Sequence, residues 1–201
     1  MKSKDKKRDN ILEAARKIFS RYGYTKTTLD DIGEVVGIKK NSLYHYFKSK
    51  EELFETIIEY EAGLYFDTMQ KLVAKEKTAT KKIFAAVLDG RKAARQRTNL
   101  YQGTVSAKME LVGVIENSFN HFIEKQIQLL KDLLNEGIKN NEFVKHNAEI
   151  VAKDIVQMNL AIEQREYQKS KFELLTEIDH NDLDRCQSDL LNLILKGLRK
   201  N

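Results

Sequence analysis

Apolar side chains recur along this chain with the period of an α-helix. In residues 9–22 they stand at Ile11, Ile18 and neighbouring positions three or four apart, which places them on one face of a helix. The same period returns in residues 117–138 and 181–199. The chain has no proline and 9 glycines, so residues that commonly interrupt helices are scarce. The pattern predicts an all-α protein.

Residues 25–54 are expected to contain two short helices joined by a tight turn. Thr28 and Asp31 have the spacing of a capping box that begins a helix, and Gly37 supplies the positive φ that ends it. A second short helix is expected from about Lys40 to Phe47. Two helices joined in this way form a helix-turn-helix, whose second helix presents its N-terminal residues to the major groove of DNA.

The second of these helices carries a dense set of polar side chains on its N-terminal and outer surface. They are Lys39, Lys40, Asn41, Ser42, Tyr44 and His45. Positive charge, amide, hydroxyl and aromatic hydrogen-bonding groups are those that bind base edges and phosphates. Taken alone, His45 would more often be an ordinary histidine, so the prediction depends on the whole group.

Several short motifs resemble the TetR family of bacterial transcriptional regulators. The motifs are Gly23-Tyr24, Thr27-Thr28, Ile32 to Gly37-Ile38, Leu43 to Phe47 and Lys50 to Leu53. They run without a gap to about residue 55, whereas the rest of the chain shows only a helical pattern, as that family's variable ligand-binding domain would. The resemblance implies a three-helix DNA-binding head in residues 1–48 and an effector-binding and dimerisation bundle in residues 49–201.

Two residues depart from the family's pattern. Lys39 stands where relatives often have a small capping residue, and Gly33 stands where they often have alanine. We therefore expect the helix that begins at Lys40 to be less well capped and the helix before it to be slightly looser. These departures bear on DNA sequence preference and leave the expected fold unchanged.

The resemblance also assigns DNA contacts to particular side chains. Tyr44, His45 and Lys50 resemble phosphate-contacting positions, and Lys40, Asn41 and Ser42 can reach base edges. The complete expected DNA-binding set is Tyr24, Thr28, Lys39, Lys40, Asn41, Ser42, Tyr44, His45, Lys48 and Lys50. For Tyr24, packing in the core of the head is an equally good interpretation.

The positive charge of the chain is concentrated in this head. Residues 1–50 contain 13 Lys and Arg against 6 Asp and Glu, a net charge of +7, whereas residues 51–201 contain 22 against 24. A basic module on a nearly neutral body is typical of a protein that binds nucleic-acid phosphates. Residues 2–8 are expected to form a frayed basic tail.

A long helix is expected to connect the head to the body. Ser49 and Glu52 form a second capping-box pattern, and apolar residues continue to about Lys75. Thr78 or Thr80 can begin the next helix, which leads into a basic run at residues 91–97. A solvated face is the main interpretation of that run, and a site for an acidic effector is the alternative.

The middle of the chain is the expected location of a pocket for a small, largely apolar effector. A loop is expected at residues 98–104 and a helix at 105–115. The search area for lining residues comprises Phe66, Met69, Phe84, Tyr101, Met109, Phe119, Phe122, Met158 and Tyr167. Aromatic residues and methionines at helical spacing are more often plain core than ligand contacts.

The last two helices, at about residues 147–175 and 181–199, are expected to form a homodimer interface. The apolar arc of the final helix is wider than one core-facing stripe needs. Its expected interface residues are Leu183, Cys186, Leu190, Leu191, Ile194 and Leu198. A two-fold dimer implies double-stranded DNA with a palindromic operator as partner.

The sequence contains no recognisable catalytic or cofactor-binding pattern. It lacks the glycine-rich phosphate loops, and its four histidines have no partners at metal-site spacing. A single cysteine, Cys186, indicates neither a disulfide nor a redox pair. No apolar stretch is long enough to span a membrane, so a cytoplasmic protein without metal or cofactor is expected. A DNA-binding protein without a small-molecule effector and, remotely, an all-α enzyme with an added helix-turn-helix are the alternatives.

Overall fold

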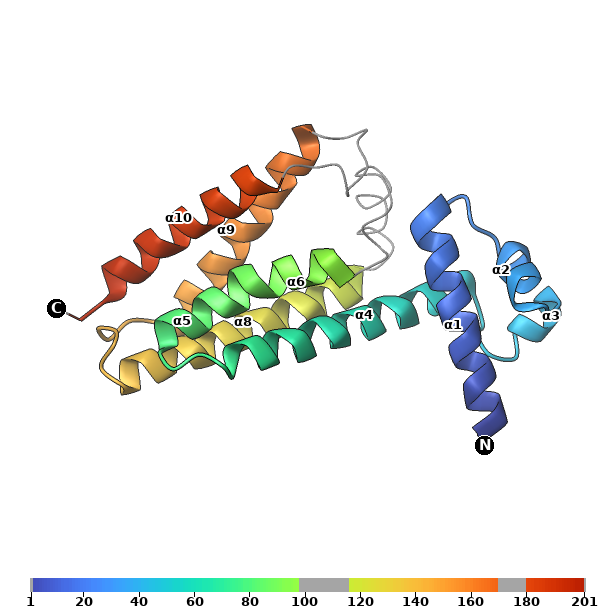
Figure 1. Ribbon diagram of the computed structural model, residues 1–201, viewed down its shortest axis with the longest axis horizontal. Helices are drawn as coiled ribbons and strands as arrows, with labels where there is room; N and C mark the ends of the chain where they lie inside the picture. Colours follow the sequence, from blue (N-terminus) through green and yellow to red (C-terminus); the bar gives the residue numbers. More distant parts are fainter. Residues whose placement is uncertain (1, 98–115, 170–179, 201) are drawn as a thin grey trace. The chain divides into compact units, whose positions relative to one another are not determined.

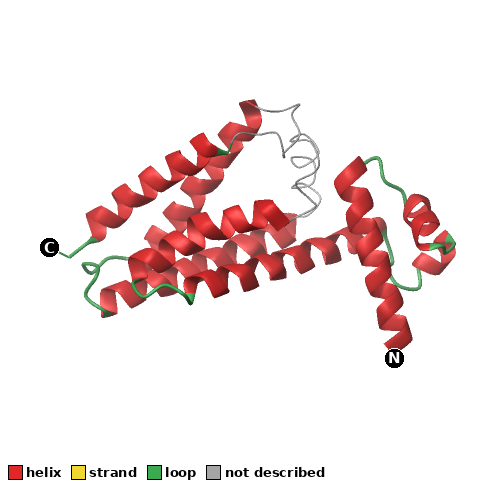
Figure 2. Cartoon of the chain, viewed as in Figure 1, coloured by secondary structure: helices red, strands yellow, loops and turns green. Residues whose placement is uncertain are grey.

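The computed structural model describes residues 2–97, 116–169 and 180–200 (Figure 1). In these residues the secondary structure is helical, apart from one isolated bridge between Phe143 and Arg199 (Figure 2). The prediction of an all-α protein is confirmed. The same part of the chain contains no helix long and apolar enough to cross a membrane.

The chain divides into two compact units, here called the head and the body. The described residues of the head are 2–62 and 116–118, and those of the body are 63–97, 119–169 and 180–200. The sequence places the boundary between residues 48 and 49. In the structure, the division between the two compact units falls inside the long helix α4 (Lys50–Val73), whose first part packs with the head.

The head begins with helix α1 (Lys2–Tyr22) and continues with α2 (Leu29–Val36). The expected frayed tail at residues 2–8 is wrong, since α1 begins at Lys2 and no glycine or proline interrupts it. The fully buried side chains of the head include Ile11, Ile32, Leu43, Phe47, Leu53 and Phe54. They form a small core beneath the helix-turn-helix.

Helix α3 (Lys40–Leu43) is shorter than the sequence predicts. Its expected extension to Phe47 is a set of turns, in which the backbone N–H of Tyr46 donates to the Leu43 carbonyl at 2.8 Å. Lys39, at the N-cap position, gives no side-chain hydrogen bond to the helix. The absence of a side-chain cap agrees with the expectation for Lys39.

The described body contains the second part of α4, from Gly63, and most of α8 (Glu116–Lys139), together with α5 (Ala79–Phe84), the π-helical segment η1 (Ala85–Asp89), α6 (Gly90–Arg97), α9 (Ala148–Lys169) and α10 (Asn181–Leu198). Thr78 caps α5, because its hydroxyl oxygen accepts a hydrogen bond from the Lys81 N–H. Nothing in the sequence predicts η1. Its buried residues, Ala85 to Leu88, belong to the main hydrophobic core of the body.

A contact between α8 and the loop after it anchors the start of α5. Gly137 leaves room for the ring of Phe143, which a Cβ at this position would overlap. The Glu142 carboxylate accepts hydrogen bonds from the backbone N–H groups of Ala79 at 2.7 Å and Thr80 at 3.1 Å. A carboxylate at the first turn of a helix satisfies N–H groups that the helix itself leaves unpaired.

Several expected features lie outside the described residues. They are the loop at 98–104, the helix at 105–115, the end of the helix expected at 147–175, and the two pocket candidates Tyr101 and Met109.

Candidate nucleic-acid interface and interior cavity

A complete capping box fixes the start of α2. The Asp31 N–H donates to the Thr28 hydroxyl oxygen at 3.2 Å, and the Thr28 N–H donates to the Asp31 carboxylate at 2.7 Å. The hydrogen bonds from Thr28 lower the pKa of Asp31 below its ordinary value. The predicted capping box is confirmed. Thr28 therefore supports α2 as well as lying on an exposed part of the head.

Two glycines shape the turn between α2 and α3. Gly37 has a φ of 71°, in the left-handed region that glycine adopts without strain. Ile38 donates its N–H to the Gly33 carbonyl at 2.9 Å, and a Cβ at Gly33 would lie 2.6 Å from the Ile38 carbonyl oxygen. The expectation that Gly33 loosens α2 is wrong, because the missing side chain allows the turn to pack tightly against this helix.

The outer side of α3 presents the predicted polar side chains to solvent. Lys39, Lys40, Asn41, Tyr44 and His45 are exposed. Ser42 is half-buried, whereas Leu43 and Phe47 are buried on the opposite side. The structure thus brings these six polar residues together on one surface of the head.

Lys40 forms an ion pair with Asp30 of α2. The Lys40 ammonium lies 3.0 Å from the Asp30 carboxylate, and both side chains are largely exposed. The hydrogen bond and the charge of Asp30 raise the pKa of Lys40, which keeps it protonated. Because an exposed pair of this kind contributes little stability, a phosphate or a base oxygen could replace Asp30 at small cost.

Lys50 is turned inward instead of projecting into solvent. Its ammonium donates to the backbone carbonyls of Tyr24 at 3.0 Å and Thr27 at 3.1 Å, and it lies 4.1 Å from the centre of the Tyr24 ring. These contacts connect the first turn of α4 to the loop between α1 and α2. In the structure, Lys50 therefore connects elements of the head, whereas the sequence predicts only a phosphate contact for it.

Tyr24 combines core packing with a polar contact. Its ring lies 5.0 Å from Phe54 and 5.8 Å from Phe19, and its hydroxyl donates to the Glu51 carboxylate at 2.7 Å. Burial, followed by this hydrogen bond, raises the pKa of Tyr24, while the same hydrogen bond lowers the pKa of Glu51. These ring contacts agree with the core interpretation of Tyr24. Lys48, in contrast, remains exposed.

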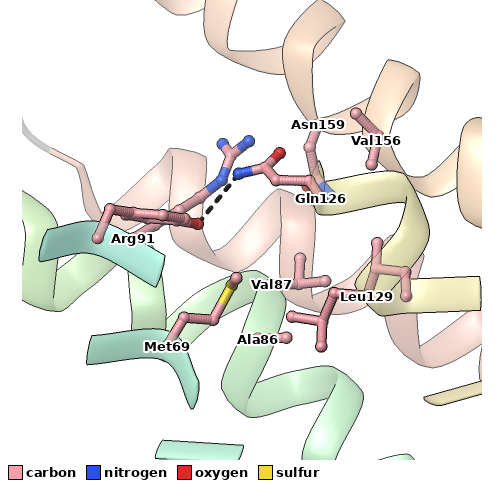
Figure 3. Close-up of a pocket in the computed structure, with 10 residues that line it drawn as sticks. Met69, Ala86, Val87, Arg91, Gln126, Leu129, Val156 and Asn159 are labelled. Atoms are coloured by element: carbon pink, nitrogen blue, oxygen red, sulfur yellow. Dashed lines mark hydrogen bonds between the residues drawn. The ribbon is translucent and has the colours of Figure 1, made fainter. Parts of the chain in front are cut away.

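A small cavity lies among the described residues of the body (Figure 3). Its apolar wall consists of Met69, Ala86, Val87, Leu129, Leu130 and Val156, and its polar lining consists of Tyr65, Arg91, Gln126 and Asn159. The cavity has a volume of about 20 Å³, enough for one or two water molecules. An organic ligand would require the side chains around it to move.

Among the described residues of the predicted search area, Met69 is the one that lines this cavity. Phe66 and Phe122 pack against Tyr65 with ring centres 5.6 and 5.2 Å away. Phe84, Phe119 and Met158 are half-buried, and Tyr167 is buried, but none of these four lines the cavity. The search selected aromatic residues and methionines, so it missed Arg91, Gln126 and Asn159; Tyr65 is aromatic but was not among the residues selected. A polar residue within an apolar stripe, such as Asn159 after Ile155 and Val156, is the signal that would have found the polar lining.

The described cationic side chains of the basic run at residues 91–97 lie close to carboxylates. Arg91 lies 2.6 Å from Glu163, and Arg95 lies 2.6 Å from Asp184. Lys92 lies 3.9 Å from the same aspartate. These pairs oppose the alternative of an open site for an acidic effector. No group of three His, Cys, Asp or Glu residues suited to a metal occurs in the described ranges.

The structure corrects part of the predicted dimer interface. Leu183 and Leu191 are 1% and 0% exposed within a single chain, so these two side chains belong to the interior. Ile194 and Leu198 are partly buried against the same core. Cys186 is exposed, Leu190 is half-buried and the neighbouring Leu193 is 65% exposed. The wide apolar arc of α10 thus has an inner side and a separate outer side.

Comparison with known sequences identifies the head most clearly. Residues 11–57 match the family described as "Bacterial regulatory proteins, tetR family". A negative transcriptional regulator of the biofilm operon icaADBC, IcaR from Staphylococcus epidermidis, is 46% identical over 52 residues, which are 26% of this chain and 28% of that protein. The chain therefore resembles about a quarter of IcaR's length.

Two further proteins are similar over most of the chain. The uncharacterised HTH-type transcriptional regulator YhgD from Bacillus subtilis is 27% identical over 161 residues, covering 76% of this chain and 80% of that protein. A transcriptional regulator from Cytophaga hutchinsonii has a similar structure, with a TM-score of 0.78 and 27% identity over 94% of this chain and 97% of that one. The similarity thus extends through the body.

Proposed function

Because the chain belongs to the tetR family of DNA-binding transcriptional regulators, we propose that it represses transcription from a palindromic operator and is released by a small molecule. The proposal depends mainly on the surface of α3. Six polar side chains lie on and beside this short helix, and the apolar side chains next to them are buried. Repression is supported by IcaR, whose name describes a negative regulator and which is 46% identical to this chain over 52 residues.

Within this proposal, the residues of the head have separate tasks. Lys40, Asn41 and Ser42 contact base edges, because the N-terminal residues of a recognition helix enter the major groove. Tyr44, His45 and Lys48 contact the phosphate backbone. Lys50, Tyr24 and Thr28 hold the elements of the head together and contribute to DNA binding by fixing its shape.

Selection of binding sites from random duplex DNA tests the proposed operator. A homodimer should enrich a sequence with two-fold symmetry, whose half-sites are spaced by about one helical turn or a multiple of it. Binding should weaken steeply with added salt, since each phosphate neutralised by the head releases counterions. An enriched site without symmetry, or no enrichment at all, would contradict the proposal.

We assign the dimer interface to the outer side of α10, which carries Cys186, Leu190 and Leu193 at helical spacing. The large exposed area of Leu193 supports this assignment. Replacing Leu193 with Glu should convert the dimer to a monomer, because two buried carboxylates would face each other across a two-fold axis. Leu64→Glu, at an exposed leucine of α4, is the matched control in sedimentation experiments. Equal dissociation of both variants would contradict the assignment.

The effector is assigned to the body cavity, with α4 as the connection to the head. Met69 and Tyr65 line the cavity from α4, and the same helix begins in the head. A ligand that favours one position of these residues would shift the balance between head arrangements. Typical couplings of about 1–3 kcal/mol would change operator affinity roughly 5- to 150-fold.

Fluorescence anisotropy of a labelled operator, titrated with small apolar compounds, tests this coupling. Compounds that raise the melting temperature of the dimer should also release the operator. Linkage requires the operator to weaken binding of the compound by the same factor. If stabilising compounds leave operator affinity unchanged, the alternative of a DNA-binding protein without a small-molecule effector is correct.

A further inference from the structure

The amide of Asn159 leaves an acceptor unsatisfied in the wall of the body cavity. Asn159 is 3% exposed, and its Nδ2 donates to the Ile155 carbonyl of the preceding helical turn at 2.9 Å. A carbonyl can only accept, so this bond fixes which end of the amide is the nitrogen. The Oδ1 atom is buried and has no hydrogen-bond partner in the described part of the chain.

A second amide next to it has the same arrangement. Gln187 of α10 is fully buried, and its Nε2 donates to the backbone carbonyl of Asn159 at 3.5 Å. This contact again leaves the amide oxygen without a donor among the described residues. A buried acceptor without a donor costs about 1–3 kcal/mol, so this region of α9 and α10 favours an occupant that supplies N–H or O–H groups.

The opposite polar group of the cavity is the Tyr65 hydroxyl. It accepts a hydrogen bond from Gln126 Nε2 at 3.2 Å, drawn as the dashed line in Figure 3. Burial raises the pKa of Tyr65 above its ordinary value, so the hydroxyl keeps its proton and can donate it. The cavity therefore offers one acceptor on α9 and one donor on α4.

The remaining wall is apolar and contains a side chain that can move. In Figure 3 the side chains of Met69, Ala86 and Val87 lie across the space from Gln126 and Asn159. Methionine is unbranched and adapts readily to a change in the shape of a cavity. Displacement of Met69 is the simplest way to enlarge the cavity of about 20 Å³.

From this arrangement we propose that the cavity binds a neutral molecule with a hydroxyl or primary amide group on a slender apolar body. The O–H or N–H group of the ligand donates to Asn159 Oδ1, its oxygen accepts from Tyr65, and its apolar part replaces Met69 against Ala86 and Val87. The inference specifies the ligand class for the effector site proposed above and rests on that proposal only for its regulatory consequence.

An anionic ligand fits the same cavity less well. Arg91, its one cationic lining residue, lies 2.6 Å from Glu163, so its charge is already balanced. A carboxylate has no proton to donate to Asn159 Oδ1, and burying its charge without a free cation is costly. The polar lining therefore selects neutral donors over carboxylates.

Three small probes separate these possibilities: 1-hexanol, its isomer methyl pentyl ether, and hexanoate. The ether retains the acceptor and the apolar volume of the alcohol but lacks its O–H donor. Binding is followed in the intact protein by NMR of ¹³C-methyl methionine, because the chain has 4 methionines and Met69 lines the cavity. We expect 1-hexanol to saturate the Met69 signal at a concentration about tenfold lower than either the ether or hexanoate.

Two variants assign this preference to atoms. Asn159→Leu removes the acceptor and should reduce the difference between alcohol and ether to about twofold or less, with Gln157→Leu on the exposed side of α9 as its control. Tyr65→Phe should weaken binding of both 1-hexanol and the ether, with Tyr60→Phe at an exposed position of α4 as its control. Unchanged far-ultraviolet circular dichroism and methionine spectra establish that each variant is folded.

The outcomes separate the ligand class from its regulatory role. Equal binding of the isomers, stronger binding of hexanoate, an unchanged preference in folded Asn159→Leu, or no selective shift of Met69 would each overturn the ligand class. If 1-hexanol binds as expected but leaves operator affinity unchanged, the ligand class stands and the proposed release mechanism fails.

Discussion

The head and the body of this protein differ in the direction of their polar side chains. In the head, a capping box, two glycines and the contacts of Lys50 fix the backbone, and the polar side chains of α3 project outward. In the body, the described helices enclose a cavity whose polar groups point inward and are incompletely paired. One unit is built to present a surface, and the other is built around an interior that an occupant would complete.

This contrast between head and body agrees with the family match, which covers residues 11–57. The Staphylococcus epidermidis regulator is 46% identical over 52 residues, whereas the Bacillus subtilis regulator that covers most of the chain is 27% identical. Contacts to a DNA backbone require much the same groups in every member of a family, while a cavity can change with its ligand. The sequence of the head therefore indicates the function that the relatives share. The ligand of the cavity has to be inferred from the residues of the body itself.

The largest expected effect is the selective loss of one unit. Phe54 is 0% exposed in the core of the head, and truncating such a side chain costs about 3–5 kcal/mol. Phe54→Ala should abolish operator binding while the Met69 and Met158 methyl signals of the body persist. Leu134→Ala, at a 0% exposed position of the body core, should instead disturb the Met69 and Met158 methyl signals. Loss of both units together in each variant, seen by NMR, would show that the two units fold as one.

The turn of the helix-turn-helix provides the next test. A side chain at Gly33 meets the Ile38 carbonyl, so Gly33→Val should destabilise the head by roughly 1–3 kcal/mol and weaken binding of every DNA sequence. Gly37→Ala should cost about 1 kcal/mol through its positive φ alone, since a Cβ there has no atom within 4 Å. Urea unfolding followed through signals of the head measures both. A stable Gly33→Val variant would show that the turn opens freely.

Lys50 and Lys48 distinguish a lysine that holds the head together from one that contacts DNA. Lys50→Met loses two hydrogen bonds from a charged donor and should cost about 1–2 kcal/mol of stability without DNA. Lys48→Met should leave stability nearly unchanged and reduce the salt dependence of DNA binding by roughly one counterion per contact. Unfolding curves and salt titrations measure the two effects. Unchanged stability of Lys50→Met would restore Lys50 to a direct phosphate contact.

How much of this was predictable depends on how far apart the interacting residues lie in the sequence. The capping box of Thr28 and Asp31 and the end of α2 at Gly37 involve neighbours and were read directly. The partners of Lys50 lie 23 and 26 residues away. Three other features depend on tertiary packing, which a local sequence pattern does not predict. They are the close approach of Ile38 to Gly33, the short α3 and the π-helical segment η1.

For the candidate sites too, prediction depends on how far apart the residues lie in the sequence. Most of the α3 surface was predicted because its residues are adjacent in sequence and share one exposed side. The cavity brings together residues from α4, η1, α6, α8 and α9, and the search by residue type found only Met69. On α10, periodicity detected the wide apolar arc, but it could not separate the inner Leu183 and Leu191 from the outer Leu193, because both sides have helical spacing.

The smallest expected effect is a pH dependence of the head. The pKa of Asp31 in the folded head lies below its ordinary value of 3.8. Its capping contribution is therefore complete above that value and is lost as the pH falls through the lowered pKa. Melting curves of wild type and Asp31→Asn should differ at neutral pH and converge on acidification. A constant difference down to about pH 2 would show that the Asp31 charge does not stabilise α2.

In the proposed function, the N-terminal residues of α3 contact base edges from the exposed surface of the head. The most direct measurement is operator affinity for every single base-pair change, compared between wild type and Asn41→Ala. We expect the variant to lose about 1–3 kcal/mol of binding free energy on the preferred operator and to lose its base preference at one or two base pairs in each half-site. An equal loss on the operator and on random DNA, with the base preferences unchanged, would contradict this expectation.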